Sequence, residues 1–334
     1  MAGTPPAPIE PVLTVEGLTT RFTMHHAVVT PVDGVSFSVM PGQIMGLVGE
    51  SGSGKSMTGF SIMGLVDAPG KVTGGSIRLA GRELVGCAPE AMRRIRGNRI
   101  AMIFQDPMMT LNPVLRIDTQ MIEAVLAHQN VGQVRARAMA REALERVGIA
   151  SPDERLKAYP HQFSGGMRQR VAIAIALLNK PDLIICDEPT TALDVTIQGQ
   201  ILYEMQKLCR ETGAALIWIT HDLSVIAGLA DSVSVMYAGK IVESGTAEQV
   251  LGDPRHPYSH ALIASAPSRN PRGQPLRQIP GMTPSLANLP VGCAFRERCE
   301  RASAQCGTAP PLRTEHGRGL RCFHPVEAAA EVAP

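Results

Sequence analysis

The sequence is poor in several features that would place it in other classes of protein. No apolar run approaches the ~20 residues that a membrane-spanning helix needs. Residues 1–11 are rich in Pro and Ala and lack the charged and apolar regions of a signal peptide. The net charge is only +2, whereas general nucleic-acid binders usually carry a strong basic bias. The seven cysteines are odd in number and do not suggest a secreted disulfide framework. We therefore expect a chain that stays in the cytoplasm and binds no nucleic acid.

The length and the residue pattern indicate an α/β protein. A chain of 334 residues can hold one large α/β domain with an appendage, or two modest domains. Short β-rich pieces separated by turns between residues 12 and 40 suggest an antiparallel sheet. Apolar residues at a spacing of three to four over residues 118–148 indicate an inserted helical subdomain. Residues 233–243, with Ala-Gly in the middle, predict a hairpin.

The most informative stretch is a glycine-rich loop between a predicted strand and a predicted helix. Residues 44–48 form an apolar run typical of a buried parallel strand, and residues 57–66 are mostly apolar and long enough for a helix. Between them, residues 49–56 read Gly-Glu-Ser-Gly-Ser-Gly-Lys-Ser, which matches the phosphate-binding pattern G-x-x-x-x-G-K-S. A chance Gly/Ser-rich turn is the alternative, and the strand and helix on either side disfavour it.

The residue types of this loop suit a nucleoside triphosphate. Its glycines let the backbone turn tightly and aim N–H groups at an anion, and the following helix N-terminus adds partial positive charge. Lys55 is expected to reach the β- and γ-phosphates, and the Ser56 hydroxyl to hold Mg²⁺. The predicted nucleotide contacts in the loop are Gly49, Ser51, Gly52, Ser53, Gly54, Lys55 and Ser56.

Three further apolar strands are each followed by polar side chains: Gln105 after residues 100–104, Asp187 and Glu188 after 183–186, and His221 after 215–220. Ligands of open α/β sheets bind at this end of the strands. Asp187 suits Mg²⁺ because hard cations prefer carboxylate oxygen. Glu188 is placed to polarise the water that attacks the γ-phosphate. Gln105 could reach the metal or that water, and we favour a γ-phosphate contact for His221 over a buried histidine.

A second anion site is indicated far from the first. Ser164-Gly165-Gly166 stands at the start of a predicted apolar helix over residues 171–178 and offers bare N–H groups and a hydroxyl. A helix cap without function is an equally good interpretation of this motif alone.

These motifs, in this order, resemble the nucleotide-binding subunit of an ABC transporter over about residues 12–255. The phosphate loop, the glutamine at 105, the signature Phe-Ser-Gly-Gly-Met at 163–167, the acidic strand end and the histidine at 221 are all present. Phe163 and Met167 depart from the commoner signature, which has Leu first and Gln last, and neither departure removes a phosphate-contacting group. The resemblance implies a P-loop NTPase fold of ABC type with an antiparallel β subdomain and a helical subdomain at about 106–170.

A narrower resemblance is to the dipeptide/oligopeptide and nickel importer ATPases. It is carried by Phe-Gln-Asp-Pro at 104–107, Tyr-Pro-His-Gln-Phe at 159–163, and the tail with His-Pro-Tyr at 256–258 and Ile-Pro-Gly-Met-Thr-Pro-Ser-Leu at 279–286. Residues 256–334 then form the importer-type C-terminal extension, small and irregular, in which 267–290 is an extended connector. We expect that the rest of the extension makes no core of its own and needs a staple.

The resemblance also implies site residues and partners. Phe22 is expected to stack on adenine, with His25 and His26 as weaker candidates and a core position as the alternative for Phe22. Asp194 belongs to the loop that contacts the nucleotide sandwich. Two such subunits enclose two ATP molecules, so that Ser164 to Gly166 serve the ATP on the partner's phosphate loop. The expected partners are a second, non-identical ATPase subunit, two membrane permeases and an extracytoplasmic peptide-binding protein, with this chain peripheral on the cytoplasmic face of the membrane.

Four cysteines crowd into the tail at positions 293, 299, 306 and 322, separated by five, six and fifteen residues. Four thiolates suit tetrahedral zinc or an iron–sulfur cluster. Structural zinc sites usually contain closely spaced cysteine pairs, which are missing here, and similar tails in the importer family suggest a [4Fe–4S] centre. We therefore predict that Cys293, Cys299, Cys306 and Cys322 hold a [4Fe–4S] cluster, with Zn²⁺ as the alternative.

The expected function is ATP hydrolysis that powers import of di- or oligopeptides. The alternatives are the same machinery acting on nickel or another small solute, and a non-transport ABC ATPase of DNA repair or translation. The last class usually carries tandem cassettes, coiled coils or basic arms, and none is visible in this sequence. The cargo itself is not encoded here, because this subunit does not contact it.

Overall fold

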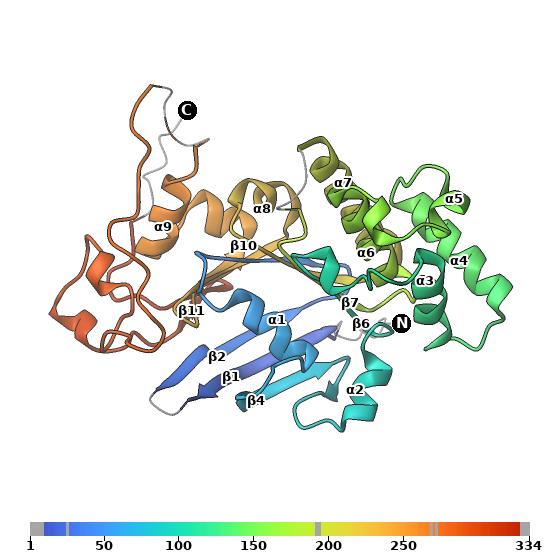
Figure 1. The fold of residues 1–334 in the computed structure, drawn as a ribbon. Helices are drawn as coiled ribbons and strands as arrows, with labels where there is room; N and C mark the ends of the chain where they lie inside the picture. Colours follow the sequence, from blue (N-terminus) through green and yellow to red (C-terminus); the bar gives the residue numbers. More distant parts are fainter. Residues whose placement is uncertain (1–9, 25–26, 191–194, 268–269, 271–272, 328–334) are drawn as a thin grey trace, which may run out of the picture. The chain divides into compact units, whose positions relative to one another are not determined.

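A computed structural model of the 334-residue chain describes residues 10–24, 27–190, 195–267, 270 and 273–327 (Figure 1). The chain divides into two compact units. Unit 1 comprises residues 1–16, 37–43 and 76–216, and unit 2 comprises residues 17–36, 44–75 and 217–334.

Unit 2 contains the phosphate loop and most of a mixed sheet. β3 (Ile44–Val48) pairs in parallel with β9 (Ser232–Tyr237), and β9 pairs antiparallel with β10 (Lys240–Thr246). β10 in turn pairs with β12 (Arg318–Leu320), and β12 with β11 (Arg313–Glu315). The helices of unit 2 are α1 (Lys55–Met63), α8 (Leu223–Leu229) and α9 (Pro257–Ala264), with short helical turns η3 (Glu248–Gly252), η5 (Arg296–Arg298) and η6 (Ala304–Gly307).

Unit 1 combines a parallel strand pair with a set of helices, of which α3 and α4 lie in the stretch predicted to be helical. β6 (Ile100–Ile103) pairs in parallel with β7 (Leu183–Asp187), with Ile103 opposite Cys186. The helices are α2 (Pro89–Ile95), α3 (Ile117–Leu126), α4 (Gln133–Arg146), α5 (Pro152–Leu156), α6 (Gly165–Leu177) and α7 (Val195–Thr212), and the 3-10 turns are η1 (Pro107–Met109) and η2 (Pro160–Gln162). β8 (Ala215–Thr220) begins in unit 1 and ends in unit 2.

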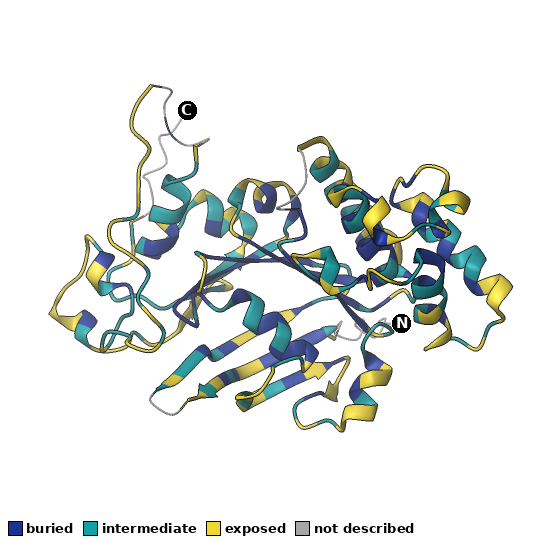
Figure 2. Cartoon of the chain, viewed as in Figure 1, coloured by how far each residue is buried: buried dark blue, intermediate teal, exposed yellow. Residues whose placement is uncertain are grey.

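The apolar runs of the sequence become fully buried strands. Every residue of β3, β6, β7 and β8 is buried, as expected for strands covered on both faces (Figure 2). Trp218 in β8 has no exposed surface. The helix α4, by contrast, buries only Ala136, Ala140 and Leu144, so one stripe packs and the other residues are partly or fully exposed. Burial therefore separates the sheet strands from the amphipathic helices as the residue periodicity predicts.

The antiparallel pieces near the N-terminus are longer than predicted. β1 (Leu13–Thr23), β2 (Val28–Val39), β4 (Gly70–Leu79) and β5 (Arg82–Glu83) are neighbours in the order β2-β1-β4-β5. β2 runs through Pro31 and Gly34, residue types that are more usual in the turns between strands. A proline is tolerated there because β2 is the edge strand, where one row of backbone N–H groups needs no partner in the sheet.

Two helix ends show how glycine sets the boundaries. α1 ends at Met63 rather than at residue 66, because Gly64 adopts the left-handed conformation (φ 63°) and its N–H bonds back to the preceding turn. Gly148 (φ 70°) follows α4, and its N–H donates to the Glu145 carbonyl.

The tail is less irregular than expected. Its residues 313–320 form the hairpin β11–β12, which extends the sheet of unit 2 through β10. Phe295 is 3% exposed and packs against Tyr237 and Tyr258, with ring centroids 5.3 and 5.4 Å away. The tail thus gains its stability in part by burying an aromatic ring in the core of unit 2.

Candidate nucleotide-binding site

The phosphate loop joins the C-terminal end of β3 to the first residue of α1. Gly49 and Gly54 adopt φ angles of 153° and 105°, which side-chain-bearing residues rarely reach. A Cβ at Gly49 would lie 2.3 Å from the Met236 carbonyl oxygen, and one at Gly54 would lie 2.0 Å from the Pro31 carbonyl oxygen. Both glycines are therefore required by space as well as by backbone conformation.

Lys55 lies inside the loop that precedes it. Its ammonium donates to the carbonyl oxygens of Gly49 at 2.8 Å and Glu50 at 2.9 Å, and the side chain of Ser53 is 3.5 Å away. The residue is only 5% exposed. The loop's own carbonyls therefore hold the Lys55 ammonium at the loop that is predicted to bind phosphate oxygens.

The serines of the loop differ in exposure. Ser51 is exposed, Ser53 is fully buried, and Ser56, in the first turn of α1, is partly buried. The backbone of Ser53 is held at both ends: its N–H donates to the Glu50 carbonyl at 3.2 Å, and its carbonyl accepts from Gly239 at 2.9 Å. The Gly239 contact ties the loop to the β9–β10 hairpin.

Sequence reasoning missed Glu50, the residue between Gly49 and Ser51. Its carboxylate accepts two hydrogen bonds from Arg298, at 2.7 and 2.9 Å, and one from Thr283 at 3.1 Å. Its backbone N–H donates to the Tyr258 hydroxyl at 2.8 Å. Burial by itself raises the pKa of Glu50, but the hydrogen bonds and positive charge of Arg298 hold it below its ordinary value. The sequence did contain a signal for this contact, because a carboxylate in an anion-binding loop requires a nearby cation.

Unit 1 brings together two of the predicted catalytic residues. Gln105 follows β6 and Glu188 follows β7, and the Gln105 amide nitrogen lies 3.3 Å from a Glu188 carboxylate oxygen. The parallel register of the two strands places their ends at the same edge. Glu188 has a φ of 46°, a conformation that non-glycine residues rarely adopt and that is enriched at functional sites. Asp187, the last residue of β7, is 4% exposed.

The signature residues form an exposed helix start. Ser164 is the N-cap of α6, and its hydroxyl accepts from the Met167 N–H at 3.3 Å. Ser164 and Gly165 are exposed, and no atom lies within 4 Å of a Cβ built at Gly165. Phe163, by contrast, is 3% exposed and anchors the segment in the core of unit 1. The departure from the commoner signature at 163 is therefore a packing residue.

The remaining predicted residues are placed as follows. His221 is exposed at the end of β8, and Asp222 after it caps α8 through Ser224. Phe22 is partly buried and its ring covers Gly70, where an added Cβ would lie 2.5 Å from the ring. Asp194 and the alternatives His25 and His26 lie outside the described residues.

The four tail cysteines converge on one small cavity without forming a metal site. Cys293, Cys299, Cys306 and Cys322 line it together, all four as free thiols. Burial raises the pKa of Cys293 and Cys299, and that of Cys322 to about 11. Within the described part of the chain, however, no group of three or more His, Cys, Asp or Glu residues is arranged to hold a metal ion. The donor type fits a cluster or zinc, whereas the geometry of a formed metal site is not seen among these described residues.

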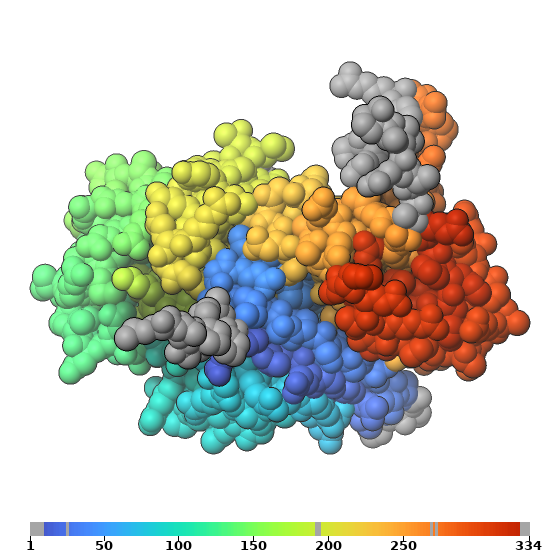
Figure 3. All heavy atoms as spheres, turned by 180° about the vertical axis from the view of Figure 1, so that it is seen from behind, coloured from blue at the N-terminus to red at the C-terminus, as the bar shows by residue number. Residues whose placement is uncertain are grey.

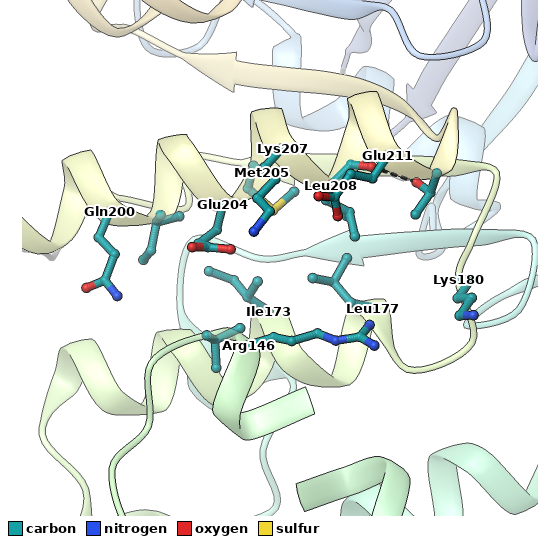
Figure 4. A pocket seen from close by; sticks show the side chains of 13 residues that line it. Arg146, Ile173, Leu177, Lys180, Gln200, Glu204, Met205, Lys207, Leu208 and Glu211 are labelled. Carbon is teal, nitrogen blue, oxygen red and sulfur yellow. Dashed lines mark hydrogen bonds between the residues drawn. The ribbon is translucent and has the colours of Figure 1, made fainter. Parts of the chain in front are cut away.

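A separate cavity of about 400 Å³ lies in unit 1 between α6 and α7. Figure 4 shows Ile173 and Leu177 facing Met205 and Leu208 across it, with Arg146 and Glu204 at its border. Its lining contains none of the residues predicted for the nucleotide site.

Comparison with known proteins identifies the family. Residues 32–191 match the model of the ABC transporter family, and residues 242–306 match the model described as the oligopeptide/dipeptide transporter C-terminal region. The Escherichia coli oligopeptide transport ATP-binding protein OppD is 46% identical over 316 residues, 94% of each chain. The chain belongs to the ABC transporter family.

Other relatives of this ABC protein support the same family assignment. A putative peptide import ATP-binding protein of Brucella abortus is 48% identical over 336 residues, covering 96% of this chain and 99% of its own length. Among solved structures, the dimeric ATP-binding cassette MJ0796 with ADP and Pi gives a TM-score of 0.65 at 25% identity, covering 70% of this chain and 98% of that one.

The predicted family and enzyme class are thereby confirmed: this is an ABC-type ATPase with a P-loop fold and mixed α/β sheets. The names of its relatives agree with the predicted role in peptide import. Among the described residues, no helix is long and apolar enough to cross a membrane.

Proposed function

We propose that this chain hydrolyses ATP to drive the import of di- and oligopeptides through an ABC transporter complex. The observation that carries the proposal is the combination of a complete phosphate loop with a C-terminal region of the oligopeptide/dipeptide transporter type. Relatives named for oligopeptide transport cover nearly the whole chain, so the likeness includes the tail as well as the ATPase core. Nickel or another small solute is the alternative cargo.

In the proposed hydrolysis, Lys55 and the loop backbone bind the β- and γ-phosphates. Ser56, Gln105 and Asp187 are the residues that would hold Mg²⁺, which neutralises phosphate charge when bound. Glu188 accepts a proton from water while the water oxygen bonds to the γ-phosphorus and the bond to ADP breaks. Gln105 restrains the Glu188 carboxylate, as their 3.3 Å contact supports, and His221 contacts the γ-phosphate.

The proposed working unit contains two ATPase subunits, the second a related but non-identical chain. Ser164, Gly165 and Gly166 then serve the ATP on the partner's phosphate loop, and the exposure of Ser164 and Gly165 at the start of α6 supports this role. Phe22 stacks on adenine, and Asp194 contributes to the shared site. Two permeases and an extracytoplasmic peptide-binding protein complete the complex, with this chain peripheral on the cytoplasmic face of the membrane.

We also retain the predicted domain division and the metal site as proposals. Residues 12–255 form the nucleotide-binding domain, with the helical subdomain at about 106–170, and residues 256–334 form the cysteine-bearing extension. A [4Fe–4S] cluster, or Zn²⁺ in its place, would staple the extension. The convergence of the four cysteines on one cavity is what supports it.

The test is purification of the intact complex from membranes by a tag on this chain. The expected complex contains two permeases and a second ATPase, and its ATPase rate rises when the binding protein is loaded with peptide. Stimulation by nickel-loaded binding protein alone would assign the alternative cargo. Co-purification with ribosomes or nucleic acid, and no permease, would overturn the transport function.

A further inference from the structure

The C-terminal segment is bonded directly to the phosphate loop. Arg298 lies beside the first tail cysteines in sequence, yet its guanidinium donates two hydrogen bonds to the Glu50 carboxylate, at 2.7 and 2.9 Å. Tyr258, at the start of α9, accepts the Glu50 N–H at 2.8 Å. Both partners come from beyond residue 255, and Figure 3 shows the C-terminal segment lying against the segment that carries the loop.

Contacts other than the one with Glu50 also hold the Arg298 side chain in place. Its side chain is only 5% exposed, its Nε donates to the Pro280 carbonyl at 2.8 Å, and its guanidinium carbon lies 5.8 Å from the ring centroids of both Tyr237 and Phe295. The Tyr258 ring packs on Tyr237, with centroids 4.6 Å apart. The two groups that hold Glu50 therefore belong to one packed aromatic cluster, and a preorganised cluster holds its ligand at little entropic cost.

The negative charge of Glu50 links its contact with Arg298 to nucleotide binding. Its lowered pKa keeps the carboxylate ionised at neutral pH, at a loop that has to accept a polyanion. An uncompensated carboxylate at this position would repel the phosphates, whereas a bidentate arginine neutralises it. The same residue also positions the binding cation, because its carbonyl accepts from the Lys55 ammonium at 2.9 Å.

We propose that Arg298 and Tyr258 are positioning residues for ATP, acting through Glu50, so that the C-terminal extension sets the nucleotide affinity of the phosphate loop. This inference rests on the proposed ATPase function and adds a role for the extension in the nucleotide site. Arg298 supplies the charge balance, and Tyr258 fixes the backbone from which Lys55 is held.

The test is a double-mutant cycle on the full chain, with Mg²⁺ and a fluorescent ATP analogue titrated to obtain Kd. Arg298→Gln leaves Glu50 as an unpaired carboxylate, so affinity should fall by about tenfold. Glu50→Gln removes the carboxylate and should cost less. The double variant should therefore bind more tightly than Arg298→Gln alone, within about twofold of Glu50→Gln. A merely structural arginine would not give this recovery.

Two further variants keep the result interpretable. Arg296→Gln is the matched control, because Arg296 bonds the Val291 carbonyl and pairs with Glu297, both within the tail, and its ATP affinity should equal that of the wild type. Tyr258→Phe removes only the hydroxyl and should weaken ATP binding by about fivefold even if Arg298→Gln lowers the melting temperature.

The inference is overturned if folded Arg298→Gln and Tyr258→Phe bind the analogue within twofold of wild type, or if the double variant is as weak as Arg298→Gln. Loss of the proposed function looks different: wild type and Arg296→Gln would then fail to bind the nucleotide at all.

Discussion

The Gln105 amide donates to the Glu188 carboxylate across 3.3 Å, joining the residues that follow two parallel strands of unit 1. Glu188 holds a left-handed backbone conformation at this point, with φ of 46°. Strain of this kind persists only where the surrounding structure enforces it. The contact and the strained backbone support the proposal that Glu188 is the general base.

Glu188→Gln is expected to bind ATP normally and to hydrolyse it at least ~100-fold more slowly, the scale for losing a general base. The amide keeps nearly the same shape but accepts no proton. Steady-state phosphate release and ATP-analogue binding measure the two effects separately. Glu123→Gln, on the exposed side of α3, is the matched control and should keep wild-type turnover. Wild-type turnover in Glu188→Gln would show that another group is the base.

Lys55→Ala is expected to weaken nucleotide binding itself, because it removes the ammonium that is held by the loop carbonyls of Gly49 and Glu50. A loss of at least tenfold in affinity is expected for removing a buried charge-assisted contact to phosphate. Titration of the ATP analogue measures it. Lys71→Ala, on β4, provides a lysine control. Undiminished affinity in Lys55→Ala would contradict the assigned role of the loop.

Ser164→Arg is expected to leave ATP binding by this chain's own phosphate loop largely intact while preventing closure on the other subunit's ATP. The reason is that Ser164 and Gly165 are exposed at the start of α6, where a partner's nucleotide could reach them. Binding to the isolated chain and ATP-induced association of the two subunits are the measurements. Equal loss of binding in the isolated chain would mean that the signature acts within one subunit.

The cysteine cavity makes a prediction about metal content. If the cluster proposal holds, protein purified without oxygen should be brown, with broad absorbance near ~400 nm, as is expected for cysteine-ligated iron–sulfur centres. Serine at Cys293, Cys299, Cys306 or Cys322 should bleach it, whereas serine at Cys87, outside the cavity, should not. Colourless protein with stoichiometric zinc would favour the alternative, and metal-free protein would exclude both.

His256 should make stability depend on pH. Burial lowers its pKa from 6.5 to about 4, while its ring accepts the Tyr258 N–H at 3.0 Å. Above pH 6.5 the histidine is neutral in both the folded and unfolded chain. Between pH 6.5 and 4 the unfolded chain binds the proton more readily, so unfolding becomes easier by roughly 3 kcal/mol.

His256→Asn keeps a side-chain acceptor for the Tyr258 N–H but does not titrate, so its stability should fall less over this pH range in chemical denaturation. Burial raises the pKa of the neighbouring Glu243, which changes stability in the opposite direction. The difference between variant and wild type, rather than either curve, therefore isolates the histidine. Parallel curves would contradict the buried neutral state.

Local pattern was sufficient for the elements that carry their own signal. The apolar runs before Gly49, Gln105, Asp187 and His221 became buried strands because continuous β-branched and aliphatic sequence can be satisfied only inside a covered sheet. Glycine and lysine spacing in residues 49–56 likewise determined the loop, since the conformations of Gly49 and Gly54 exclude other residues. The family and enzyme class followed from these motifs alone.

Only the tertiary structure revealed what the tail contacts. No periodicity in residues 313–320 predicts strands, and they form β11 and β12 because β10 offers them an open edge. Glu50 and Arg298 are 248 residues apart in sequence, and the residues around each of them do not indicate that the two pair. A carboxylate in an anion-binding loop indicates from sequence alone that a cation lies nearby. Which cation this is depends on how the chain folds, because the energy of a charge pair depends on the distance between the charges in space and not in sequence.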